Sequence, residues 1–193
     1  MTSMNPLIII VLTFATVSIA ELGDKTQIMT ISLATRYKNK PVFWGMFLGM
    51  GVITMIGVAV GTLFYQFIPI FYVKIIAASI FILFGLFSLF NKEKEVEENI
   101  CDKKVFSTSF LLALVAELGD KTQFVIIAMT ARYQAPIIVL MGALGGLALI
   151  IGVSVFMGDK IAQVVEKDKL DMISALLFLV LGTVFLLDIF ILG

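Results

Sequence analysis

The same seven residues, Glu-Leu-Gly-Asp-Lys-Thr-Gln, occur twice in this 193-residue chain, at 21–27 and again at 117–123. The match extends over 21–37 and 117–133, which align without a gap and share ten of 17 residues. Seven consecutive identities in an apolar background do not arise by chance, so the chain contains an internal duplication. Any fold of this chain must therefore accommodate two copies of one charged segment.

The residues around these segments are typical of a membrane protein. Hydrophobic residues make up 60% of the chain and charged residues 15%, whereas a soluble domain is roughly half apolar and a quarter charged. Six apolar stretches reach the length of about 20 residues that crosses a bilayer. They cover roughly 6–36, 41–65, 70–90, 106–133, 136–157 and 172–192. We therefore predict an all-α integral membrane protein with six transmembrane helices.

The duplication divides these helices into two repeats of three. We expect the first repeat at 1–91, a charged cytoplasmic loop at 92–105 and the second repeat at 106–193. A unit with an odd number of crossings places its second copy upside down, which is the inverted-topology arrangement of many secondary transporters. Such transporters bind their substrate near the bilayer midplane, between the repeats.

The distribution of positive residues predicts the orientation. Cytoplasmic loops carry an excess of Lys and Arg, and only Lys74 and Arg132 fall on the second face. Ten fall on the first: Arg36, Lys38, Lys40, Lys92, Lys94, Lys103, Lys104, Lys160, Lys167 and Lys169. We expect this first face in the cytoplasm and both termini outside it.

Both charged motifs fall near the middle of the membrane, about 20 Å of helix from either end of their segments. Each ionisable group there costs at least ~2.5–3.5 kcal/mol, so such groups face the protein interior and are paired. The groups concerned are Glu21, Asp24, Lys25, Glu117, Asp120 and Lys121. Salt bridges that only tie helices together are one interpretation. Small residues and a few hydroxyls suffice for packing, however, which favours a functional site.

The charges and donors of the two motifs suit a hard divalent cation. Each motif holds two carboxylates and one lysine, so the pair has a net charge of −2, which one divalent ion would neutralise. Carboxylate, hydroxyl and amide oxygens are typical ligands of Ca²⁺, Mg²⁺ or Mn²⁺. Further oxygens are offered by Thr26, Thr122, Gln27 and Gln123, and softer thioethers by Met29 and Met129, although these methionines are also ordinary core residues.

Glycines indicate where the helices bend or meet. Because the first segment is longer than the bilayer is thick, we expect either a strong tilt or a break at Gly23, and at Gly119 in the second copy. If the helix is continuous, the hydroxyls of Ser18, Ser32 and Thr35 lie on the same helical face as Glu21. Paired glycines also suggest that the second and fifth stretches pack closely; they are Gly45, Gly49, Gly57, Gly61, Gly142, Gly145 and Gly146.

Several function classes are disfavoured by the composition. The chain has no histidine, a single cysteine, equal numbers of acidic and basic residues, and no Gly-rich phosphate loop. We therefore expect no cofactor, nucleic acid or ATP. An intramembrane aspartyl protease using Asp24 and Asp120 is an alternative, but neighbouring lysines would keep those aspartates ionised. A cation channel is another, although a strongly binding carboxylate site would slow conduction.

Two E-x-G-D-K-[ST] motifs, one opening each half of a six-helix chain, resemble the Golgi-type cation exchanger family, whose bacterial members include MneA-type manganese exporters. The resemblance implies a membrane transporter, not an enzyme, that exchanges Mn²⁺ or Ca²⁺ for protons. It also implies that Glu21, Asp24, Glu117 and Asp120 bind the metal. From their donors and charges we expect six further motif residues to line the site or couple it to protons: Lys25, Lys121, Thr26, Thr122, Gln27 and Gln123. We expect Mn²⁺ export across a bacterial plasma membrane.

Overall fold

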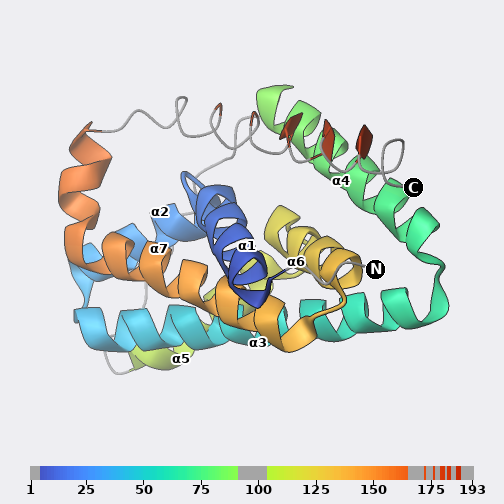
Figure 1. The fold of residues 1–193 in the computed structure, drawn as a ribbon. Coiled ribbons are helices and arrows are strands. Elements are labelled where there is room, and N and C mark those ends of the chain that lie inside the picture. Colours follow the sequence, from blue (N-terminus) through green and yellow to red (C-terminus); the bar gives the residue numbers. More distant parts are fainter. Residues whose placement is uncertain are drawn as a thin grey trace.

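The computed structural model describes residues 5–90 and 104–164, together with single positions between 172 and 187. Regular structure in these ranges is helical (Figure 1). The helices are α1 (Pro6–Glu21), α2 (Lys25–Arg36), α3 (Asn39–Phe67), α4 (Ile70–Phe90), α5 (Val105–Glu117), α6 (Lys121–Tyr133) and α7 (Pro136–Val164). Most of the charged loop and of the sixth apolar stretch lies outside the described residues.

Two long helices have the dimensions of membrane spans within the described part of the chain. They are α3, over Asn39–Phe67, and the Pro136–Phe156 part of α7. The consecutive helices α1 and α2 count as a third span if the pair is taken as one broken crossing, bent by 71°. The all-α fold is thus confirmed with two or three candidate spans, while six crossings and inverted topology stay predictions.

Both copies of the motif interrupt their helices at glycine. Gly23 separates α1 from α2, and Gly119 separates α5 from α6; each has φ +76°. A left-handed backbone is disfavoured for residues with a Cβ atom, so glycine allows the chain to turn there. Of the two outcomes expected from the sequence, the break is therefore the one observed, and it occurs in both repeats.

The two repeats are interlocked. Helix α1 packs mainly against α7, and α3 packs mainly against α5, so each broken segment lies on the long helix of the other repeat. Helices α2 and α6 continue these contacts on α7 and α3. Figure 1 shows α1 crossing near α7 in the middle of the molecule. The motif ends of the broken helices consequently meet at the centre.

Glycines allow these crossings to be close. A Cβ atom at Gly49 would lie 2.5 Å from the carbonyl oxygen of Phe110 in α5, and one at Gly142 would lie 2.7 Å from that of Ile10 in α1. The glycine pairs therefore face the broken helices. Helices α3 and α7 do pack together, as expected, but their contact does not run through these pairs.

The exterior is apolar and the interior contains polar groups. Large side chains such as Trp44, Phe67 and Phe156 are 52–79% exposed. Buried polar residues include Thr13, Ser18, Glu21, Asp24, Thr54, Ser109 and Glu117. This distribution suits a protein whose surroundings are lipid and whose polar interior carries the function.

Candidate functional site

The helix breaks place all four motif carboxylates at helix ends. Glu21 and Glu117 are the last residues of α1 and α5, and Asp24 and Asp120 are the N-cap residues of α2 and α6. Helix N-termini carry partial positive charge and favour carboxylates. Residues three and four apart share one face of a continuous helix. Because the helix is broken here, Glu21, Asp24 and Lys25 do not share such a face.

Glutamines stabilise the two breaks in the same way. The Gly23 backbone N–H donates to Gln27 Oε1 over 2.6 Å, and the Gly119 N–H donates to Gln123 Oε1 over 2.7 Å. The sequence suggested these amides as lining residues. The structure places their oxygens on the backbone of the turn in both copies, and Gln27 also lines a narrow recess at Glu21.

Three carboxylates gather at the centre. Glu21, Asp24 and Glu117 each contribute an oxygen, and these oxygens lie within 4.8 Å of one another. All three residues are buried, with exposed fractions of 1%, 1% and 2%. Cations such as Ca²⁺ bind oxygen at about 2.3–2.6 Å, so one ion between the three carboxylates could contact all of them after small adjustments.

Asp120, the fourth carboxylate, lies in a different environment. Lys25 Nζ is 2.6 Å from Asp120 Oδ2, and the backbone N–H of Lys121 donates to Asp120 Oδ1 over 2.6 Å. Of the four ligands implied by the resemblance, the structure thus brings three together and holds the fourth against a lysine of the other repeat.

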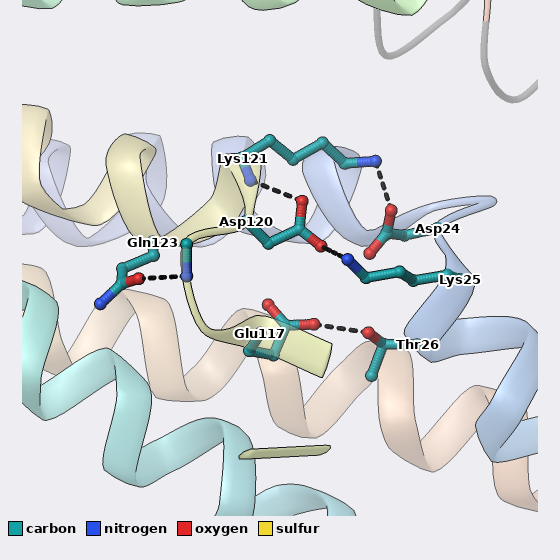
Figure 2. Close-up of polar contacts among 8 residues, drawn as sticks. Asp24, Lys25, Thr26, Glu117, Asp120, Lys121 and Gln123 are labelled. Carbon is teal, nitrogen blue, oxygen red and sulfur yellow. Dashed lines mark hydrogen bonds and ion pairs between the residues drawn. The ribbon is translucent and has the colours of Figure 1, made fainter. Parts of the chain in front are cut away.

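The two lysines are exchanged between the repeats. Lys25 of the first copy pairs with Asp120 of the second, and Lys121 of the second pairs with Asp24 of the first (Figure 2). The Asp24 side chain is 0% exposed and that of Asp120 is 13% exposed, so the two pairs differ in burial. Each repeat supplies the counter-ion of the other.

A threonine of the first repeat also forms a hydrogen bond to a carboxylate of the second. The Thr26 hydroxyl donates to Glu117 Oε1 over 2.5 Å (Figure 2). The equivalent hydroxyl of Thr122 lies beside Glu21 without a hydrogen bond of ordinary geometry, and Glu21 Oε1 has no partner among the described residues. The site is therefore symmetric in composition but not in its hydrogen bonds.

The remaining sequence predictions have mixed outcomes. The shared helical face of Ser18, Ser32 and Thr35 was expected only for a continuous helix, and the break between the first residue and the other two removes that condition. Met29 and Met129 are buried in the core. A narrow recess at Glu21 instead includes Met50 of α3 and Ser154 of α7. Neither of these two residues carries a local sequence signal, since only tertiary packing brings them to the motif.

Comparison with known proteins gives the family. The model for the divalent cation/proton antiporter GDT1 matches residues 9–96 and 105–191, one segment in each half of the chain. The GDT1-like protein sll0615 of Synechocystis is 28% identical over 87% of this chain and 91% of its own length. No solved structure matches.

Two further relatives are matched over less of their own length. A Vibrio cholerae protein named "Putative manganese exporter" is 28% identical over 65% of this chain and 63% of its own length. The Arabidopsis chloroplast protein PAM71 is 26% identical over 91% of this chain and 56% of its own. The family consists of transporters and not enzymes, as the resemblance implied. The chain belongs to the GDT1 family of divalent cation/proton antiporters.

Proposed function

We propose that this protein exports a divalent cation, Mn²⁺ foremost, from the cytoplasm in exchange for protons, through one site built from both motifs. The observation that carries the proposal is the group of three buried carboxylates, Glu21, Asp24 and Glu117, whose oxygens lie within 4.8 Å of one another. Buried carboxylates that repel one another need a cation or protons. Both are the substrates of an antiporter.

The division of roles within the site follows from the contacts. Glu21, Asp24 and Glu117 form the ligand group, and Asp120 contributes charge while it holds Lys25. Four carboxylates and two ammonium groups leave a net charge of −2. One divalent cation or two protons neutralise that charge equally well, so an electroneutral exchange of two protons for one metal ion is expected.

Six crossings in two inverted repeats would place this site near the midplane, open to either side in turn. The excess of Lys and Arg on one face supports a cytoplasmic location for that face and extracytoplasmic termini, in a bacterial plasma membrane. Preference for Mn²⁺ over Ca²⁺ is supported by the resemblance to bacterial manganese exporters and by the name of the Vibrio relative.

The contacts disfavour the two alternatives. A protease would need Asp24 and Asp120 to share one proton, yet each is paired with a lysine of the other repeat. A channel would conduct metal without obligatory proton movement. Neither a protease nor a channel agrees with membership of an antiporter family.

Reconstituted vesicles provide the test. An inward Mn²⁺ gradient should drive protons out of vesicles that contain the wild type, reported by an internal pH dye. Glu21→Gln and Glu117→Gln should abolish both fluxes while the protein remains folded in the membrane. Metal uptake without proton counterflow would indicate a channel, and full transport by both variants would exclude the proposed site.

A further inference from the structure

A narrow recess extends from the carboxylate group between α2, α3 and α7. Its oxygen-bearing lining consists of Glu21, Thr26, Gln27, Thr30 and Ser154, and among the described residues its sulfur comes from Met50 alone. Isoleucine and leucine side chains of α7 complete the lining. Oxygen donors facing a single thioether inside an apolar wall form an unusual combination, and they lie next to the proposed ion site.

The polar groups in this recess have unused capacity to bind a cation. Glu21 Oε1 is buried and has no hydrogen-bond partner among the described residues, which is costly unless a ligand or proton satisfies it. The hydroxyls of Thr30 and Ser154 donate to the carbonyl oxygens of Thr26 and Ile150, each over 2.7 Å. Since those hydroxyls already donate their protons, the lone pairs on their oxygens remain available as acceptors.

The position of Met50 is specific to the first repeat. The corresponding glycine crossings, Gly49 on Phe110 of α5 and Gly146 on Phe14 of α1, are 97 residues apart, so the counterpart of Met50 is Leu147. The second repeat therefore has no thioether in the equivalent position. Met50 is 2% exposed, and neither Met29 nor Met129 lines the recess.

We propose that Met50 selects the transported ion, by adding a thioether ligand beside Glu21 that transition-metal ions accept and that Ca²⁺ and Mg²⁺ do not. This inference rests on the proposed function. Ca²⁺ and Mg²⁺ bind almost only oxygen, whereas polarizable sulfur favours softer metal ions. A single sulfur among oxygens thus costs an alkaline-earth ion one ligand, costs the harder transition-metal ion Mn²⁺ less, and suits soft Cd²⁺ best.

The test compares Met50→Leu with Met46→Leu in vesicles, with Mn²⁺, Cd²⁺ and Ca²⁺ supplied one at a time and then in competition. Leucine preserves the volume of methionine and is well tolerated in cores. Met46 lies one turn earlier on α3, is also fully buried and does not line the recess. We expect Met50→Leu to lower the preference for Mn²⁺ and Cd²⁺ over Ca²⁺ by about tenfold, and Met46→Leu to leave it unchanged.

A second variant separates lost sulfur from lost packing. Met50→Gln replaces the sulfur by an amide oxygen and should shift selectivity further toward Ca²⁺ than Met50→Leu does. An unchanged ratio of Mn²⁺ to Ca²⁺ transport in both Met50 variants, beside an active wild type, would overturn the role of Met50 and leave the proposed function standing. A wild type that moves neither ion against protons would instead overturn the proposed function.

Discussion

Thr26 and Glu117 are 91 residues apart in the sequence, and the hydroxyl of the first donates to the carboxylate of the second over 2.5 Å. The hydroxyl fixes the orientation of a carboxylate that belongs to the other repeat. Residues that orient metal ligands commonly change metal affinity by about 10–100-fold when they are replaced.

We therefore expect Thr26→Val to raise the Mn²⁺ concentration at half-maximal transport by roughly tenfold or more. Thr26→Ser, which keeps the hydroxyl, should restore it. Thr122→Val should have a smaller effect, because Thr122 makes no hydrogen bond of ordinary geometry to Glu21. The measurement is the concentration dependence of Mn²⁺ uptake into vesicles. Equal effects of the two valine substitutions would contradict the asymmetry.

The exchanged ion pairs predict a change in transported charge. Lys25→Gln leaves the empty site at −3 and the metal-loaded site at −1, so an additional proton or monovalent cation should enter each cycle. Charge moved per metal ion, measured in vesicles under an imposed potential, reports this. The same stoichiometry in wild type and variant would show that Lys25 serves only packing.

A matched pair of double variants sharpens this prediction. Lys25→Gln with Asp120→Asn restores a net charge of −2 and spares the three clustered carboxylates, so it should recover electroneutral transport. Lys121→Gln with Asp24→Asn restores the same net charge but removes a proposed ligand, so transport should stay lost. Recovery in both would place Asp24 outside the ligand group.

Close contact between α3 and α5 predicts that alanine substitutions at two nearby glycines differ in their effect on the free energy of unfolding. Gly49→Ala would bring a Cβ atom within 2.5 Å of the Phe110 carbonyl oxygen, whereas among the described residues Gly51→Ala would meet only Leu144 Cδ2, at 3.6 Å. We expect the first to lower the free energy of unfolding by about 1–3 kcal/mol and the second to change it little. Thermal unfolding in detergent measures both.

The second helix break allows the backbone effect to be measured alone. A Cβ atom at Gly119 would meet nothing within 4 Å among the described residues, so Gly119→Ala introduces only the strain of a left-handed conformation. That strain is about 1–2 kcal/mol. Gly119→Asn should be tolerated better, because asparagine adopts this conformation more readily. Equal unfolding temperatures for glycine and alanine would contradict the assigned backbone strain.

The orientation predicted from the loop charges is tested with Cys101, which lies outside the described residues. A membrane-impermeant thiol reagent should label it only after the cytoplasmic face is made accessible, and a reporter fused after Gly193 should read extracytoplasmic. Labelling of Cys101 in intact cells would reverse the assigned orientation.

Much of the architecture could be predicted because it depends on local signals. The duplication, the long apolar helices and the burial of the motif acids follow from identity, length and the cost of charge in lipid. The break at Gly23 was one of two outcomes, since the sequence shows that the segment is too long but not how the excess is accommodated.

The pairing within the site could not be predicted, because it is decided between the repeats. Spacing places Lys25 four residues after Glu21, which suggests compensation within one helix. The break between Glu21 and Lys25 removes their shared helical face. Packing between the repeats, such as that of α3 with α5, brings Asp120 to Lys25 instead. Tertiary packing also separates Asp120 from the other three acids and places Met50 beside Glu21.

The exchange of lysines has a consequence for the origin of such a chain. Because each half neutralises an aspartate of its counterpart, neither half is electrically complete alone, and two separate identical chains could assemble the same pairs. Joining them in one polypeptide frees the copies to diverge while the reciprocal contacts are kept. In this protein a methionine lines the recess at Glu21 from one half, where the corresponding residue of the other half is a leucine.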